Sequence, residues 1–200
     1  MSLFLLFTKK FAPHMVDKDF LAQIVIKPLD STHGRAAFSC GITRIDNYLK
    51  SSASSHAKDD FVKVYVAITD ASTDVLGYYG LCPHSLDVSA LPPELYKKLP
   101  KWPTIPSIYL LMVGVDKSCQ KKGLGTFLLA DVFKRCIKVA DQIGGHFIVL
   151  DAHDEETAGF YRKIGFVDLP SQSLRMFINM KTVRAAAAVH ANQSCPPSSS

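Results

Sequence analysis

The feature that most constrains this chain is a short glycine turn set between an apolar run and an amphipathic segment. The run 107–116 is almost wholly apolar, which is typical of a buried strand. Gln120-Lys-Lys-Gly-Leu-Gly125 follows it, and a helical repeat of apolar residues then continues to about Gln142. Because Gly123 and Gly125 carry no Cβ, the backbone can turn sharply there and approach a ligand closely. The sequence therefore predicts a strand, a tight turn and a helix.

The turn also has the chemistry of an anion site. The main-chain amides of residues 121–126 would point unpaired out of a helix N-terminus, and Lys121 and Lys122 stand beside them. This arrangement predicts a pyrophosphate site. The turn lacks the Gly-Lys-Ser/Thr ending of a P-loop and the third glycine of a dinucleotide-binding fold. On the motif alone, a plain strand-to-helix connection stays open as the alternative.

The composition suits one compact domain. The 200 residues are 48% hydrophobic, which is enough for a full core, and no apolar stretch is long enough to cross a membrane. Five scattered cysteines without a C-x-x-C pair argue against a zinc site and favour a reducing cytoplasm. The net charge of +5 excludes no class of function by itself, and solvated lysine faces explain it as well as polyanion binding does.

The spacing of apolar residues predicts the order of the elements. An extension over residues 1–22 precedes a domain over residues 23–183, and the tail over residues 184–200 is expected to be disordered. Within the domain we expect strands at 23–27, 62–69, 75–87, 107–116, 146–152, 166–167 and 175–180, two helical pieces between 31 and 58 broken near Cys40-Gly41, and helices at 92–99, from the glycine turn to about 142, and at 155–164. This order is an α/β (α+β) architecture with one mixed sheet of six to seven strands flanked by about four helices.

The glycine turn and a second block together resemble a known family. Q-x-x-G-x-G after an apolar strand is similar to the acetyl-CoA pyrophosphate loop of the GNAT N-acetyltransferases. Residues 147–152 and 154–166 resemble the fifth strand of that family, the helix after it and its F-Y-x-x-x-G-F ending. The resemblance implies a GNAT fold and an acyltransferase that takes its acetyl group from acetyl-CoA, with no metal. It assigns the cofactor contacts to the end of the strand and the turn, at Val113, Val115, Gln120, Lys121, Lys122, Gly123, Leu124, Gly125 and Thr126.

Tyr161 is the candidate general acid. The family pattern places a tyrosine here, beside the cofactor sulfur, and a phenol with a pKa of about 10 can donate a proton to a departing thiolate. Packing beside Phe160 is its alternative role. No base is evident, although His153, Asp151 and Glu155 lie near the right strand end. That lack favours an α-amine acceptor, because an α-amine with a pKa of about 7.7–8.0 is partly neutral in the cell whereas a lysine is protonated.

The amino-terminal half carries a second resemblance. Phe38-Ser-Cys-Gly41 followed by Asp46-Asn-Tyr-Leu49, together with residues 77–81 and 99–103, is similar to the GNAT toxins of bacterial toxin–antitoxin modules. The likeness implies a cytoplasmic toxin that acetylates the α-amino group of aminoacyl-tRNA and blocks translation. It also implies a ribbon-helix-helix antitoxin as the partner, and the scattered basic residues suit an RNA substrate.

Two other functions stay open on the sequence. The chain could be a GNAT enzyme that acetylates a small amine or a protein or peptide N-terminus without any toxin role, or a CoA-binding module without catalysis. The sequence leaves open which aminoacyl-tRNA is acetylated and whether two copies form a homodimer.

Overall fold

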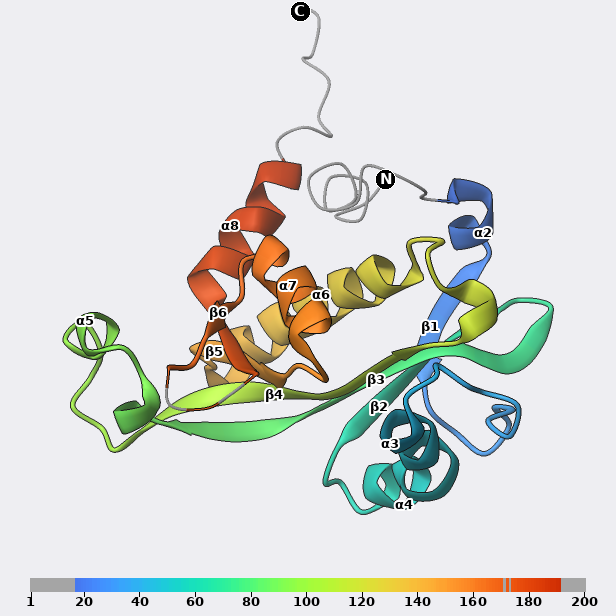
Figure 1. The fold of residues 1–200 in the computed structure, drawn as a ribbon, viewed down its shortest axis with the longest axis horizontal. Coiled ribbons are helices and arrows are strands. Elements are labelled where there is room, and N and C mark those ends of the chain that lie inside the picture. The colour runs from blue at the N-terminus through green and yellow to red at the C-terminus, as the bar shows by residue number, and fades with distance from the viewer. Residues whose placement is uncertain (1–16, 171, 173, 192–200) are drawn as a thin grey trace, which may run out of the picture. The chain divides into compact units, whose positions relative to one another are not determined.

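One seven-stranded sheet, in the order β1-β2-β3-β4-β5-β7-β6, organises the chain (Figure 1). The computed structural model describes residues 17–170, 172 and 174–191. The predicted class, with six to seven strands, is confirmed. The strands are Ile24–Pro28 (β1), Lys63–Thr69 (β2), Ser72–Asp87 (β3), Thr104–Val115 (β4), Phe147–Asp151 (β5), Val167–Asp168 (β6) and Arg175–Asn179 (β7). The α-helices are Lys18–Ala22 (α2), Thr43–Asn47 (α3), Ala53–Lys58 (α4), Pro93–Tyr96 (α5), Leu124–Ile143 (α6), Glu155–Ile164 (α7) and Met180–Ala191 (α8).

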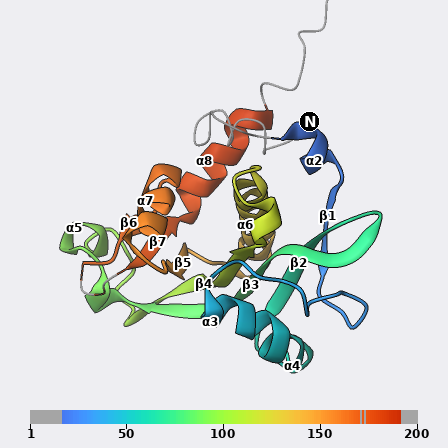
Figure 2. The same cartoon turned by 45° about the vertical axis from the view of Figure 1, so that its right-hand side comes forward.

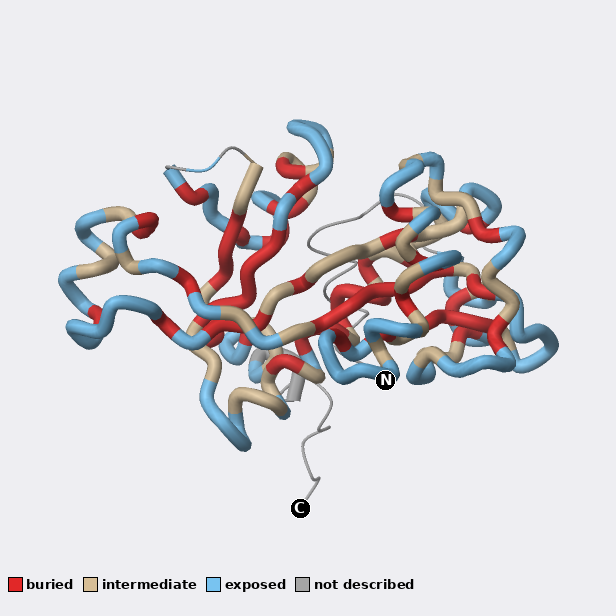
Figure 3. Tube along the Cα trace, turned by 90° about the horizontal axis from the view of Figure 1, so that it is seen from below, coloured by how far each residue is buried: buried red, intermediate tan, exposed pale blue. Residues whose placement is uncertain are grey.

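Residue contacts divide the described chain into two compact units. The amino-terminal unit comprises residues 17–82 and 110–132, and the carboxy-terminal unit comprises residues 83–109 and 133–191. Each unit has its own hydrophobic core. The buried stretches, red in Figure 3, alternate along the chain with exposed turns.

In the amino-terminal unit, helices pack against both faces of β2 and β3. Figure 2 shows α3 and α4 on one face, where the hydroxyl of Tyr78 donates to the carbonyl of Ile45, 2.7 Å away. Successive residues of a strand point to opposite faces, so the neighbouring Tyr79 points the other way and donates to the carboxylate of Asp131 in α6. The strand spacing thus explains why one helix pair and the start of α6 lie on opposite sides of β3.

The carboxy-terminal unit is held by the antiparallel pair β5 and β7. Val149 lies directly opposite Phe177, and Asp151 lies opposite Arg175. The apolar members of this pair belong to one core with residues from β3, β4 and the segment between them. The core therefore lies on the same face as Asp151 and Arg175, because opposed residues and residues two apart share a face.

The prediction of a helix before Cys40 is wrong. The first helix of this region begins at Thr43, and the residues before it form a loop in which Gly34 bridges to Asp74. Asp46 accepts hydrogen bonds from the Ser39 hydroxyl and the Cys40 amide. Such side-chain bonds to nearby backbone compete with helix formation, which is why apolar spacing alone misled. Beyond Cys40 the predicted helical piece is confirmed, with a π-helical turn at Tyr48–Ser52 (η1) between α3 and α4.

The two ends of the described chain also differ from expectation. Residues 18–22 of the expected extension form α2, whose first turn is capped by Asp17 through a 2.9 Å bond from the Phe20 amide. At the other end α8 continues to Ala191, although residues 184–200 were expected to be disordered. Alanine is the strongest helix former, so the alanine run sustains a helix without an amphipathic pattern. The remaining parts of both segments, residues 1–16 and 192–200, lie outside the described residues.

Candidate functional site

The glycine turn after β4 contains two left-handed residues. Lys121 has a φ of 61° and Gly123 a φ of 91°, so the backbone reverses within three residues of the start of α6. Turns of this kind gather successive amides on one side of the chain. The first hydrogen bond of α6 joins the Phe127 amide to the Gly123 carbonyl at 3.0 Å. The predicted strand, turn and helix are therefore present.

The main-chain amides of residues 121–126 have no acceptor within the part of the chain that the structure describes. The side chains of Leu124 and Thr126 are buried, so these two residues can offer a ligand little besides their main chain. The Lys122 ammonium lies 5.2 Å from the centre of the Phe20 ring, and Lys121 is exposed. This turn therefore combines amides that have no acceptor among the described residues, the positive end of a long helix and two ammonium groups, which are the features that favour binding of a pyrophosphate.

The turn is held in place by a set of hydrogen bonds that we call the bracket, formed by Ser39, Cys40, Asp46, Asp116 and Gln120. Asp116 accepts from the Ser39 amide at 2.8 Å, and Asp46 accepts from the Cys40 amide at 2.7 Å. The side-chain amide of Gln120 donates to the carbonyls of Cys40 and Val115, at 2.8 and 3.1 Å. The Gln120 side chain therefore ties the turn to the loop before Gly41 and to the end of β4, and its amide nitrogen is engaged by protein carbonyls.

The charges of the bracket are stabilised by these bonds. Partial burial opposes the ionisation of Asp46, but the hydrogen bonds from Cys40 and Ser39 outweigh it and lower the pKa of Asp46 below its ordinary value. Partial burial likewise opposes the ionisation of Asp116, and the bonds from Ser39 and Ser118 lower its pKa. Both carboxylates are thus ionised acceptors at neutral pH, and they fix the loop before Gly41 beside the end of β4.

Gly114 lets the segment around Phe38 pack on the end of β4. A Cβ at this position would lie 2.9 Å from Ile45, 3.0 Å from Tyr78 and 3.1 Å from Phe38. Gly114 is flanked by Val113 and Val115, which are both half-buried. The strand end that the resemblance assigns to the pantetheine arm is therefore fixed from one face by three aromatic or branched side chains.

Tyr161 lies on α7, in the carboxy-terminal unit. It is buried, with its ring 5.5 Å from that of Phe160 and 5.4 Å from that of Phe166. Burial raises the pKa of Tyr161 above its ordinary value, so the phenol keeps its proton at neutral pH. Its hydroxyl forms no hydrogen bond with any described residue. The phenol of Tyr161 is therefore protonated and has no acceptor among the described residues.

The carboxylates near the end of β5 are engaged. Arg175 donates to both oxygens of Asp151, at 2.6 and 2.8 Å, and Tyr109 donates to Asp151 at 2.6 Å. Glu155 is paired with Arg162 at the start of α7. Both carboxylates are therefore engaged by arginine side chains of the protein.

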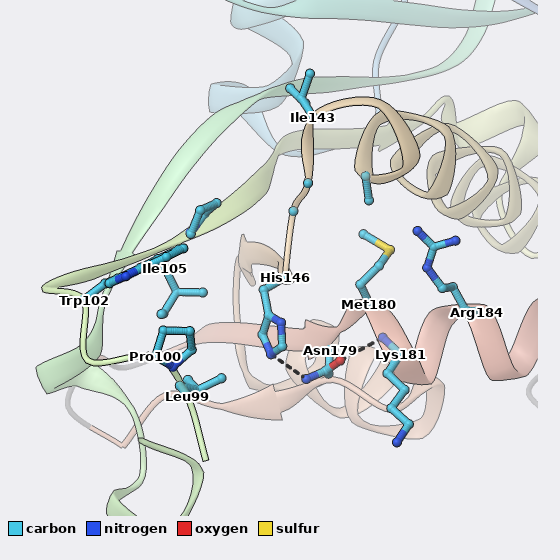
Figure 4. A pocket seen from close by; sticks show the side chains of 14 residues that line it. Leu99, Pro100, Trp102, Ile105, Ile143, His146, Asn179, Met180, Lys181 and Arg184 are labelled. Atoms are coloured by element: carbon cyan, nitrogen blue, oxygen red, sulfur yellow. Dashed lines mark hydrogen bonds between the residues drawn. The ribbon is translucent and has the colours of Figure 1, made fainter. Parts of the chain in front are cut away.

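The carboxy-terminal unit also contains a cavity of about 530 Å³ (Figure 4). Trp102 and Ile105 line it on one side and Met180 on another, and His146 is hydrogen-bonded to Asn179 at 3.0 Å. The cavity contains none of the site residues predicted from the sequence. Among the described residues, no cluster of three or more His, Cys, Asp or Glu side chains could hold a metal, and no helix is long and apolar enough to span a membrane.

Comparison with known families shows which class of protein contains a strand, glycine turn and helix of this kind. Residues 60–168 match the acetyltransferase (GNAT) domain, and this range is more than half of the chain. The chain belongs to the GNAT acetyltransferases. Their fold and the use of acetyl-CoA, both expected from the glycine turn, are thereby confirmed.

The acetyltransferase is similar to named toxins over most of its length. It is 38% identical to a "Probable toxin TacT" of Sinorhizobium fredii over 172 residues, which cover 82% of this chain and 95% of the relative. It is 31% identical to a "tRNA-acetylating toxin" of Mycobacterium tuberculosis, over 74% of this chain and 87% of the relative. A solved structure of AtaT with acetyl-methionyl-tRNAfMet superposes with a TM-score of 0.75 at 25% identity, covering 81% of this chain and 98% of that chain.

The sequence predicted the glycine turn, which the structure contains, but not the bracket; the role of Tyr161 stays a prediction. The signal for the bracket was present, because Asp46 belongs to the F-x-C-G-x(4)-D piece that resembles the toxins. That piece was interpreted as a helix broken at glycine, with no role for its aspartate. The roles of Asp116 and of the Gln120 side chain depend on distant residues, and no local pattern indicates them.

Proposed function

We propose that this acetyltransferase transfers the acetyl group of acetyl-CoA to the α-amino group of aminoacyl-tRNA, and that it acts in the cytoplasm as a toxin that blocks translation. The observation that carries the proposal is the row of main-chain amides at residues 121–126, which have no acceptor among the described residues and stand at the start of a 20-residue helix. Acyl transfer from a nucleotide thioester needs such a site to hold the diphosphate.

The cofactor assignment follows from the same turn. The amides of the turn, including those of Lys121, Gly123 and Gly125, would bind the pyrophosphate, and the Lys121 and Lys122 ammonium groups would add charge. Val113 and Val115 would pair with the pantetheine arm through their main chain. The Gln120 side chain keeps the turn in this shape through its two bonds to protein carbonyls.

Tyr161 would serve as the general acid. Its hydroxyl is without a hydrogen-bond partner among the described residues, and burial raises its pKa, so it holds a proton that it can donate. The step that requires this proton is the departure of the CoA thiolate, whose conjugate acid has a pKa near that of an ordinary thiol, about 8.5.

The choice of aminoacyl-tRNA rests on two lines of support. The relatives include a protein named as a tRNA-acetylating toxin, and a solved AtaT structure contains an acetylated aminoacyl-tRNA. The carboxylates near β5 are engaged by Arg175 and Arg162, so the chain offers no strong carboxylate base there. An α-amine with a pKa of about 7.7–8.0 needs less help to lose its proton than a lysine does.

The toxin role implies a partner that restrains it. One relative is named a probable toxin, and a small DNA-binding ribbon-helix-helix protein is the antitoxin that the resemblance suggests. A homodimer is compatible with the proposal and is not required by it. The competing function is acetylation of a small amine or of a protein or peptide N-terminus without toxicity.

The test combines growth with direct detection of the product. Expressed alone in bacterial cells, the acetyltransferase should arrest growth, and a Tyr161→Phe variant, which keeps the ring but lacks the proton, should not. In vitro, bulk aminoacyl-tRNA incubated with labelled acetyl-CoA should yield N-acetylated aminoacyl esters by mass spectrometry. Transfer to polyamines or peptides, with untouched tRNA and normal growth, would favour the competing function.

A further inference from the structure

A polar cluster lies on one face of the carboxy-terminal unit, formed by four side chains from four strands: His84 of β3, Tyr109 of β4, Asp151 of β5 and Arg175 of β7. Each lies an even number of residues from an apolar residue of the core on its own strand. Those apolar residues are Leu86, Ile105, Val149 and Phe177. Since residues two apart on a strand share a face, the cluster continues the core at the end of β5.

Three members of the cluster are bound to one another. Asp151 and Arg175 are directly opposed in the β5–β7 register, and Arg175 reaches both oxygens of Asp151. The Tyr109 hydroxyl donates a hydrogen bond to the same carboxylate, and burial, together with this bond, raises the pKa of Tyr109 to about 12. The three side chains thus form a fixed network in which the charge of Asp151 is neutralised.

His84 is the member without such a bond. Its ring lies 5.3 Å from the Tyr109 ring, tilted by 38°, and no described residue forms a hydrogen bond with its imidazole. Among buried side-chain nitrogen and oxygen atoms of the described residues, the one without a partner is the hydroxyl of Tyr48. The imidazole nitrogens are therefore not sealed inside the protein, and a ligand can reach them.

His84 is held in its neutral form. Partial burial lowers its pKa below 6.5, the positive charge of Arg175 acts in the same direction, and Asp151 opposes both. Arg175 and Asp151 act on the ring through their charges, and the protonated Tyr109 lies beside it. A neutral imidazole has a free lone pair, which is what a proton acceptor needs.

We propose that His84 accepts the proton of the acceptor ammonium in the acetyl transfer. The proposal rests on the proposed function and adds a base to it. One ammonium proton passes to His84 and then to solvent, and the neutral nitrogen bonds to the thioester carbonyl carbon. The carbon–sulfur bond breaks, the sulfur takes the Tyr161 proton, and the second proton of the nitrogen is released as Tyr161 is reprotonated from solvent.

The two faces of the carboxy-terminal unit suit this division of roles. Gly165 ends α7 and packs against Ile178, with 3.6 Å between an added Cβ and the Ile178 side chain. Ile178 points to the face opposite that of Phe177 and Arg175. Helix α7, which carries Tyr161, therefore covers one face of the sheet here, and His84 lies on the other. Strand β5 ends at Asp151, so a carbonyl bound beyond that residue could receive the amine from the His84 face and release the thiolate toward the Tyr161 face.

The experiment compares the pH dependence of two histidine variants. The rate of transfer from labelled acetyl-CoA to bulk aminoacyl-tRNA is measured for the wild type, for His84→Gln and for the control His146→Gln at pH 6.5 and 8.0. His146 is a matched control because partial burial lowers its pKa too and its ring is committed to Asn179. An α-amine with a pKa of about 7.7–8.0 is roughly a tenth or less neutral at pH 6.5 and about half or more neutral at pH 8.0.

We expect His84→Gln to lose about tenfold or more in kcat/KM at pH 6.5 and several times less at pH 8.0, where the amine deprotonates by itself. His146→Gln should follow the wild type at both values. A His84→Gln loss of equal size at both pH values, or no loss, would overturn the base role while leaving the proposed function intact. No transfer by the wild type would instead refute the proposed function and this inference with it.

A second measurement distinguishes the loss of a proton acceptor from poor folding of the variant. His84→Ala is assayed with and without added imidazole, at concentrations corrected for the folded fraction from circular dichroism. Restoration of the rate by imidazole, larger at pH 6.5 than at pH 8.0, supports a lost proton acceptor. A folded His84→Ala protein that imidazole does not restore contradicts it.

Discussion

The side-chain amide of Gln120 lies 2.8 Å from the carbonyl oxygen of Cys40, although the two residues are 80 positions apart in the chain. This bond joins the turn that precedes α6 to the loop that precedes α3. Asp46 holds the same loop through the Cys40 amide. The shape of the proposed pyrophosphate site therefore depends on side chains that bind the protein's own main chain.

Replacing Gln120 with alanine should weaken acetyl-CoA binding. The change removes two hydrogen bonds that fix the turn, so the turn must be ordered when the ligand binds. If this costs about 1 kcal/mol of binding free energy, Kd rises roughly fivefold. Isothermal calorimetry measures the effect. Gln142→Ala, at an exposed position near the end of α6, is the control and should bind like the wild type. Equal Kd values for both variants would show that the bracket has no influence on the turn.

A methyl group at Gly114 should destabilise the protein. The new Cβ would lie within 3.1 Å of Ile45, Tyr78 and Phe38, and overpacking of a core costs about 1–3 kcal/mol. Gly159→Ala is the matched control. Gly159 lies inside α7, a Cβ added there meets no atom within 4 Å, and alanine favours a helix over glycine by about 1 kcal/mol. The urea concentration at the midpoint of unfolding should therefore fall for Gly114→Ala and rise for Gly159→Ala. A neutral Gly114→Ala would mean that the packing around β4 is loose.

Removing the hydroxyl of Tyr48 and removing that of Tyr78 should change the free energy of unfolding in opposite directions. The Tyr48 hydroxyl is buried and has no partner among the described residues, whereas that of Tyr78 donates to the Ile45 carbonyl. Tyr48→Phe removes an unsatisfied polar group and should raise the free energy of unfolding by about 1 kcal/mol. Tyr78→Phe should lower it by a similar amount. The two rings stack 6.5 Å apart, so both substitutions are made in one environment. Thermal melts that fall for both variants would contradict the assignment.

Acid should unfold the protein partly through Asp46. Its pKa is lowered below 3.8 in the folded state, so its contribution is present above pH 3.8 and is lost as the pH falls through the folded pKa. Asp46→Asn should be less stable than the wild type at pH 5, by less than about 1 kcal/mol because the carboxylate is partly exposed. The difference should shrink as the pH approaches 2.5. A gap that stays constant over this range would exclude a titrating role for Asp46.

The elements that carry the site were predictable because their signals are local. The helical repeat after Gly125 and the F-Y-x-x-x-G-F ending around Tyr161 each lie within one turn or one helix, where backbone geometry and side-chain spacing repeat together. The loop at residues 31–42 was misjudged for the same reason. Its apolar spacing resembles a helix, but bonds from Asp46 and packing on Gly114 hold it in another conformation.

The sequence by itself determined the strand, the glycine turn, the long helix and the family, because each depends on residues close together in the chain. The tertiary structure alone decided that Gln120 meets Cys40, that Arg175 neutralises Asp151, and that His84 lies beside Tyr109 without a hydrogen bond to any described residue. These relationships arise from strand register and from loops that meet after folding, so residues far apart in the chain become neighbours without any local pattern that marks them.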